Sequence, residues 1–169
     1  MKIIGKMVLC ATCVAALCVG CQSTPADGAW SKDLEDMLVR RQLQRLVRCP
    51  FFSERRTLHV MAIGEIKNDT VLVSKDDIEF MKSEIASELT NSGVVMISTV
   101  GEGRNAPQKG RNAIAPTLKL FGKLTQRDSR NKDGGFQREF VLELSIVELA
   151  SGIQIWKDKS SACIVVGGK

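Results

Sequence analysis

Residues 1–20 constrain this chain most, because they decide how much of it is left to fold. Lys2 and Lys6 precede a short apolar run, Met7–Val19, and Gly20 follows it. A positive start, a short apolar run and a small residue are typical of a secretory signal that is removed. A membrane-spanning helix needs roughly 20 apolar residues, so the run is short for a transmembrane anchor. We therefore expect the mature chain to begin near residue 21, outside the cytoplasm.

Cys21 directly follows Gly20, and this arrangement resembles a bacterial lipobox. The resemblance implies that Cys21 is acylated and becomes the first residue of the mature protein. One position departs from the pattern, because Cys18 stands where leucine is usual. An ordinary cleaved signal without lipid is the alternative. Gln22 replaces the aspartate that holds many lipoproteins in the inner membrane, so we expect a lipid anchor in the outer membrane, with the protein facing the periplasm.

Composition allows one ordinary domain after the signal. Removing residues 1–20 of 169 leaves 149 residues, enough to bury a core. We expect residues 21–29 to form a short tether and residues 30–169 a single domain. The net charge of +5 falls to about +3 without Lys2 and Lys6. That excess is small and no basic stripe alternates with aromatic residues, so we do not expect nucleic acid as a partner.

The cysteines predict no metal site. Four of the six lie at or before residue 21, so the pair Cys10 and Cys13 belongs to the signal. Cys49 and Cys163 remain. They pair in an oxidising compartment if the fold brings them together, and otherwise stay separate thiols. The sequence leaves both alternatives open.

The apolar pattern predicts two helices and five strands. Ser74 begins a capping box with Asp77, Ile78 opens an apolar stripe continued by Met81, Ile85 and Leu89, and Gly93 ends the helix. This element order predicts an α+β fold with a small, mixed, mostly antiparallel sheet flanked by helices. The other expected elements are a helix over 31–47, a strand over 58–64, a polar turn at 67–69, a strand over 94–100, a loop over 101–114, and strands over 118–126, 136–149 and 153–159.

The sequence carries no sign of catalysis. Its one histidine, His59, lies in a strand pattern, where a packed side chain is the expected role. No HExxH, GxSxG or P-loop pattern occurs, and no histidine, cysteine and acidic residues recur at metal-ligand spacing. We therefore expect neither an enzyme nor a cofactor.

One strand pattern suggests a binding surface. In the stretch 118–126, Lys119, Phe121 and Lys123 point to the more polar side of the strand. An aromatic between two cations on an exposed sheet face would anchor a protein partner. The alternative is a helix that covers this face and makes Phe121 part of the core. Four arginines of the first helix offer a second cationic surface, for which a solvated helix face is the favoured interpretation: Arg40, Arg41, Arg45 and Arg48.

Several stretches resemble a known family. They are Trp30–Asp33, Ile66–Thr70, Glu88–Gly93, Phe121–Leu124 and Glu148–Asp158. Together with the lipobox, they are similar to the penicillin-binding-protein activator lipoproteins, the LpoB family. The resemblance implies a non-enzymatic outer-membrane lipoprotein that binds a class A penicillin-binding protein and stimulates peptidoglycan synthesis. It also implies a sheet and helices similar to the TolB N-terminal and CsgG-type domains, with Phe121 on the partner-binding face.

Two features depart from that family. Its studied members have a long, Pro-rich tether, whereas residues 22–29 reach less than roughly 30 Å at about 3.3–3.6 Å per residue. The segment 101–114 is also shorter and richer in glycine and proline. The short tether favours the alternative function, a structural component of an envelope or secretion assembly similar to CsgG-type proteins. A binder of peptidoglycan or a small ligand is a third interpretation.

Overall fold

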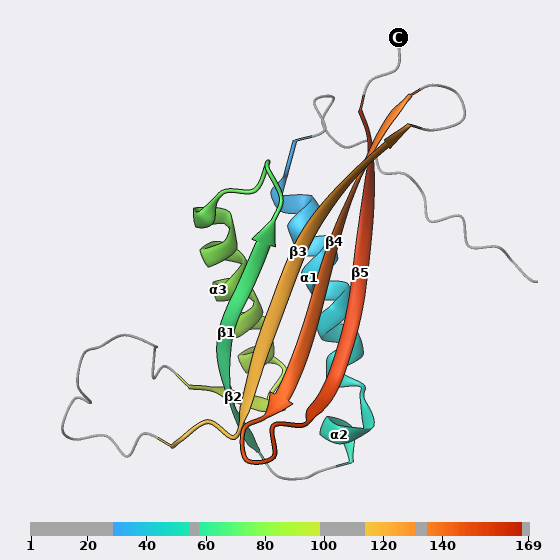
Figure 1. The fold of residues 1–169 in the computed structure, drawn as a ribbon. Coiled ribbons are helices and arrows are strands. Elements are labelled where there is room, and N and C mark those ends of the chain that lie inside the picture. Colours follow the sequence, from blue (N-terminus) through green and yellow to red (C-terminus); the bar gives the residue numbers. More distant parts are fainter. Residues whose placement is uncertain (1–28, 55–57, 99–113, 131–134, 167–169) are drawn as a thin grey trace, which may run out of the picture.

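Five strands form one mixed sheet, with helices packed against it (Figure 1). A computed structural model describes residues 29–54, 58–98, 114–130 and 135–166. Cys21, nearly all of the expected tether and residues 101–113 lie outside these ranges. The elements are α1 (Lys32–Val47), α2 (Pro50–Ser53), β1 (His59–Asp69), α3 (Lys75–Asn91), β2 (Val95–Ile97), β3 (Leu118–Arg130), β4 (Phe136–Glu148) and β5 (Gln154–Val166).

The sheet has the order β2-β1-β3-β4-β5. β1 pairs in parallel with β2 and β3, while β3, β4 and β5 form a long antiparallel ladder. Most paired residues therefore belong to antiparallel strands. This confirms the predicted α+β class and the mixed, mostly antiparallel sheet.

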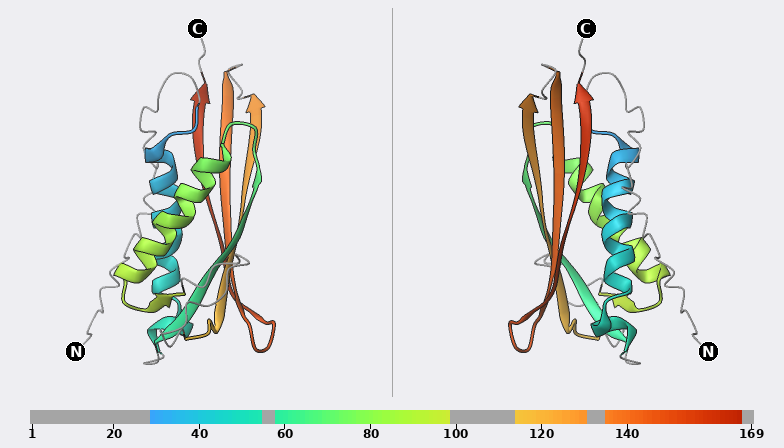
Figure 2. Two further views of the ribbon diagram at one scale, coloured as in Figure 1. Left: turned by 90° about the vertical axis from the view of Figure 1, so that its left-hand side faces the viewer. Right: turned by 90° about the vertical axis from the view of Figure 1, so that its right-hand side faces the viewer.

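The long helices cover one face of the sheet, and no described helix covers the other (Figure 2). On α3, the four predicted apolar positions are all buried, with at most 5% of each side chain exposed. The predicted capping box is present, because the Asp77 N–H donates to Ser74 Oγ (3.1 Å) and the Ser74 N–H donates to Asp77 Oδ2 (2.8 Å). Gly93 follows the helix at φ +70°, as expected for a C-terminal cap.

A buried polar contact sets the position of α1 on the sheet. Gln42 is fully buried and donates through Nε2 to the carbonyl of Leu142 and to Ser160 Oγ, the latter at 3.1 Å. Ser160 Oγ donates in turn to the carbonyl of Leu38 (2.9 Å). These bonds tie α1 to β4 and β5. Because buried polar groups are costly when unpaired, another position of the helix along the sheet is disfavoured.

Several strand boundaries differ from the sequence prediction. β3 continues past the predicted end at residue 126 to Arg130, and β2 covers only Val95–Ile97 of the predicted 94–100. The turn predicted at 67–69 is wrong, because these residues continue β1 and pair with β3 as far as Asp69 and Thr125. β5 extends beyond the predicted end at residue 159 to Val166, which pairs with Phe136. At 67–69 the neighbouring strand β3 supplies hydrogen-bonding partners that outweigh weak local strand propensity, whereas β5 ends in Ile164, Val165 and Val166, which favour a strand by themselves. The tight turn predicted at 150–152 is present, with Gly152 at φ +69°.

Cys49 and Cys163 do not form a disulfide. Cys49 is half-buried after α1, and Cys163 is exposed on β5. The sequence left a disulfide and two separate thiols open, and the structure has two separate thiols.

Glu35 is an uncommon buried carboxyl in the first turn of α1. It is only 3% exposed. Burial and the nearby charge of Glu84 raise its pKa from 4.5 to about 7, although a hydrogen bond with Trp30 opposes the shift. The folded protein therefore binds a proton at this site more tightly than the unfolded chain does.

This shift predicts that stability falls as the pH rises. The contribution of Glu35 is fully present below about pH 4.5 and is lost as the pH rises to about 7, because the ionised carboxylate is poorly accommodated in the folded state. We expect Glu35→Gln to remove on the order of 1–3 kcal/mol of this pH dependence. Denaturant unfolding at pH 5 and pH 7.5 would measure it. Asp33→Asn, an exposed change in the same helical turn, is the control, and an equal effect of both changes would contradict the prediction.

Candidate docking site on the open face of the sheet

The predicted alternation along β3 is confirmed. Leu118, Leu120 and Leu124 are buried beneath the helices. Phe121, at an intervening position, is half-buried and lies outside the apolar core cluster. No described helix covers its side of the sheet (Figure 2), so the alternative that placed Phe121 beneath a helix is wrong for the described structure. We call this uncovered side the open face.

Gly64 lets the Phe121 ring pack against β1, and this contact buries part of the ring. A Cβ atom at Gly64 would lie 2.8 Å from the carbonyl oxygen of Leu120 and 3.2 Å from Cδ1 of Phe121. The Phe121 ring therefore packs over the backbone of β1, where a side chain is missing. The register between β1 and β3 also shifts between Ile63 and Ile66, as in a β-bulge. Sequence reasoning missed this contact, although a glycine inside a strand pattern is a signal for such close approach.

The two predicted lysines take different roles beside the ring. The Lys119 Nζ atom lies 5.2 Å from the centroid of the Phe121 ring, within the range of a cation–π contact. Lys123 instead pairs with Asp69 at 2.9 Å, and Lys67 lies 3.4 Å from the same carboxylate. The hydrogen bond from Lys123 is the main reason why the pKa of Asp69 lies below its usual value. Asp69 therefore partly neutralises Lys123, while Lys119 stays with the aromatic ring.

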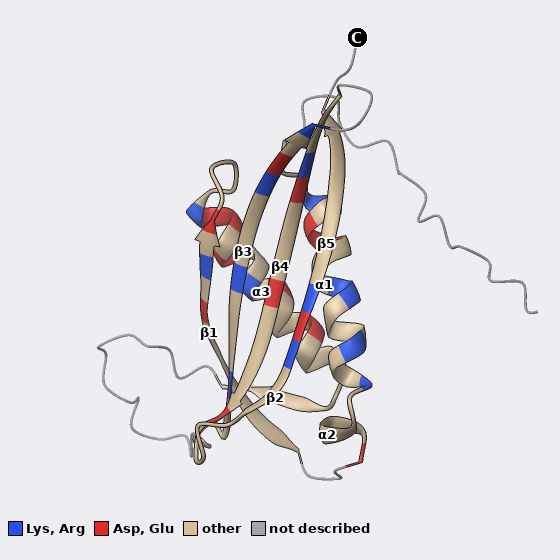
Figure 3. Cartoon of the chain, turned by 45° about the vertical axis from the view of Figure 1, so that its right-hand side comes forward, with Lys and Arg blue, Asp and Glu red and all other residues tan. Residues whose placement is uncertain are grey.

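A second group of charges lies across the face on β4 and β5. Glu143 sits between Lys157 (2.7 Å) and Lys159 (2.8 Å), whose hydrogen bonds lower its pKa. The strand pairing places Ser145 between Phe121 and Lys157. Around Phe121, five lysines thus share the surface with Asp69, Glu143 and the exposed Glu65 of β1, so positive charges outnumber negative ones. Figure 3 shows lysine and arginine positions on β1, β3 and β5. Such a surface favours an acidic partner.

A groove of about 790 Å³ adjoins this site. Residues 62–65 of β1 form one wall and α3 contributes the other, through residues such as Glu79 and Lys82. Lys119, Pro116 and Leu149 also line it, so the groove reaches the edge of the open face. The groove therefore adjoins the surface around Lys119.

No cluster of three or more histidine, cysteine and acidic side chains that could hold a metal ion occurs among the described residues. The ring of His59 stacks on Phe51, with centroids 5.0 Å apart, in keeping with a packed role. Within the same ranges, no helix combines the length and apolar character needed to cross a bilayer.

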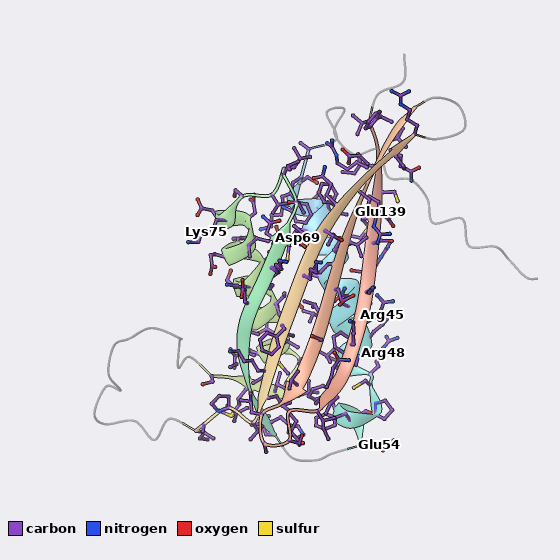
Figure 4. The ribbon with its side chains drawn as sticks, viewed as in Figure 1. Arg45, Arg48, Glu54, Asp69, Lys75 and Glu139 are labelled. Atoms are coloured by element: carbon purple, nitrogen blue, oxygen red, sulfur yellow. The ribbon has the colours of Figure 1, made fainter. Side chains whose placement is uncertain are left out.

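The arginines of α1 lie apart from the Phe121 site. Arg45 binds Asp158 (2.7 Å) and the carbonyl of Lys159 (3.1 Å), so it serves mainly to hold α1 against β5. Arg40 lies 3.8 Å from Asp36 of its own helix. Figure 4 shows Arg45 and Arg48 on the helix side of the molecule. Arg104 and Arg111, considered as an alternative binding surface, lie outside the described residues.

Comparison with known proteins relates the fold to one group of solved structures. The C-terminal domain of LpoB from Salmonella enterica matches with a TM-score of 0.52 at 11% identity, over 76% of this chain and 97% of that domain. The same domain from Escherichia coli matches with a TM-score of 0.51 at 11% identity, with the same coverage. The fold is LpoB-like. No family model matches the sequence. No curated protein sequence matches it either.

The packing of Phe121 on Gly64 predicts a specific cost of substitution. In Gly64→Ala the new methyl group would meet the Leu120 carbonyl and the Phe121 ring, and the backbone atom cannot move away freely. We expect the free energy of unfolding to fall by about 1–3 kcal/mol, the usual cost of overpacking. Chemical denaturation measures this change. Ser145→Ala, on the opposite side of Phe121, is the control and should change stability by about 0.5 kcal/mol or less. Equal stability of Gly64→Ala and the unmodified protein would show that the ring does not occupy this position.

Proposed function

We propose that this chain is an outer-membrane lipoprotein that binds a class A penicillin-binding protein and activates its peptidoglycan synthesis. It is a binding protein and not an enzyme. The observation that carries the proposal is the half-buried Phe121 on an open sheet face, surrounded by an excess of lysines. The LpoB-like fold and the lipobox at Cys21 support it.

Phe121 and the two lysines beside it have different roles in binding. Phe121 is the apolar anchor, because an aromatic that loses its remaining contact with water contributes most to a typical protein interface. Lys119 and Lys123 attract an acidic patch of the partner. Binding activates the partner if this chain binds the active conformation of the partner more tightly than the inactive one. A ligand shifts a conformational equilibrium only through such a difference in affinity.

A structural component of an envelope or secretion assembly is the second candidate. The observation that favours it is the length of the tether, since residues 22–29 reach less than roughly 30 Å. In such an assembly the open face would contact further copies of the chain. The mass of the purified protein in solution separates the two candidates, because a stable ring or oligomer supports an assembly and a monomer supports the activator.

Lipid attachment at Cys21 predicts a change in mass and location. In Cys21→Ala the thiol that accepts the lipid is missing, so the protein should remain unprocessed or be released from the membrane fraction. Mass spectrometry of the unmodified protein should find an acylated mature N-terminus at Cys21. Cys163→Ala, which removes an exposed thiol of β5, is the control and should leave acylation unchanged. An unmodified thiol at a mature Cys21 would refute the anchor.

Truncation of Phe121 is the test of the binding site. We expect Phe121→Ala to weaken binding to a cognate class A synthase by about 2 kcal/mol, or roughly 30-fold in Kd. The free energy of unfolding should fall by only about 1 kcal/mol, because the ring is half-buried and outside the core. Titration calorimetry and denaturant unfolding measure the two quantities on the same samples.

Phe80→Ala provides a matched control for this test. Phe80 is 44% exposed on α3, so its loss removes a similar ring from the helix side. The affinity of the Phe80→Ala protein for the synthase should stay unchanged. If Phe121→Ala unfolds the domain, Phe121 is a core residue. If Phe121→Ala binds the synthase with unchanged affinity, the binding surface lies elsewhere.

A further inference from the structure

The loop between β1 and α3 lies near the point where the chain leaves its tether. Lys32, the first residue of α1, has its Nζ atom 3.5 Å from Glu84 and 4.5 Å from the centroid of the Phe80 ring, both on α3. Figure 4 shows Asp69 at the end of β1 and Lys75 at the start of α3, at the same end of the molecule. The β4–β5 turn lies at the opposite end (Figure 1).

This loop presents two apolar side chains to solvent. Val71 is 88% exposed, more than any other large apolar side chain that the structure describes, and Leu72 is 39% exposed. The next residue, Val73, is buried at 6% and fixes the loop to the core. An exposed valine and leucine at a loop tip gain free energy from any apolar surface that covers them.

Hydrogen bonds hold this loop in one conformation. Asn68 Nδ2 donates to the carbonyl of Val73 (2.7 Å), and Thr70 Oγ1 donates to Asn68 Oδ1 (2.8 Å). The Val73 N–H donates to Thr70 Oγ1 (3.2 Å). Val71 and Leu72 are therefore displayed by a structured turn, and their burial against another surface costs little ordering of the backbone.

Two of the carboxylates beside the loop are already paired. Asp69 binds Lys123 and Lys67, at 2.9 Å and 3.4 Å. Asp77 accepts hydrogen bonds in the capping box of α3. Lys75 and Asp76 follow the loop with opposite charges. Repulsion between this end and a lipid headgroup layer is consequently weak.

The length of the tether places this end close to a membrane. From Cys21 to Trp30 the chain reaches at most about 30 Å. The strand pairing sets Asp69 opposite Thr125, so the start of β3 at Leu118 lies seven residues, roughly 24 Å, farther along the sheet. Because α1 begins on the side of the β1–α3 loop and the β4–β5 turn lies at the opposite end (Figure 1), a lipid on Cys21 favours the loop as the membrane-facing side.

We propose that the loop Thr70–Ser74 docks on the lipid bilayer, with Val71 and Leu72 inserted into its interfacial region. The proposal rests on the lipid anchor of the proposed function. Two exposed side chains are too few for a stable protein interface, which buries about 1,200–2,000 Å². They suffice as a second membrane contact beside an acyl anchor, where each added apolar group strengthens attachment. Docking in this way turns the groove beside Lys119 and Leu149 toward the periplasm.

Depth-dependent quenching tests the proposal on the acylated mature protein. Val71→Trp and its matched control, Ile153→Trp, are reconstituted into vesicles of phosphatidylethanolamine and phosphatidylglycerol, with and without brominated acyl chains. Ile153 is also exposed, at 62%, but lies in the opposite turn. After subtraction of the signal of the unmodified protein, we expect brominated lipid to reduce the added fluorescence of Val71→Trp at least two-fold and to leave that of Ile153→Trp unchanged. Leu72→Trp replaces Val71→Trp if that variant does not fold.

Flotation of the same samples separates docking from anchoring. Protein that floats with the vesicles, and whose position 71 is quenched selectively, supports the proposal. Protein that floats without quenching at position 71, or with equal quenching at both ends, overturns docking and leaves the proposed anchor intact. Protein that does not float overturns both the anchor and the docking that depends on it.

Discussion

The burial of one face of the sheet beneath α1 and α3 is the interaction on which the rest of the structure depends. Leu120 and Leu124 of β3 lie fully buried under the helices, as do Leu142 and Leu144 of β4. Because side chains alternate along a strand, this burial turns the intervening positions outward. A slip of one residue would exchange the two sets, placing lysines in the core and leucines in water. The open face therefore follows directly from the packing of the core.

Close approach between β1 and β3 turns this open face into a candidate site. Without a side chain at Gly64, the Phe121 ring can lie on the neighbouring strand, and Lys119 lies beside the ring. The ring is consequently held in place before any partner binds, which lowers the entropy cost of association. The surrounding ion pairs leave a modest positive excess, suited to selecting an acidic surface and not to binding polyanions without selectivity.

The two ends of the molecule carry different surfaces. One end carries the ordered turn with Val71 and Leu72, next to the beginning of α1. The other carries the groove and the start of β3, from which the open face extends. With the first end at a membrane, the second projects into the periplasm, where a partner protein can reach it. A short tether is then compatible with binding, provided that the partner itself lies close to the membrane or extends toward it.

The sequence alone determined the elements that depend on local chemistry. The capping box at Ser74, the apolar stripe of α3 and the turn at Gly152 agree with the structure, because each depends on residues within a few positions of one another. Alternation along β3 also correctly grouped Lys119, Phe121 and Lys123 on one side of the strand. Only the tertiary structure decided that this side is uncovered, that β1 continues through Asp69, and that Glu35 is buried. These features depend on contacts between segments far apart in the chain, and the energies of those contacts outweigh local propensity.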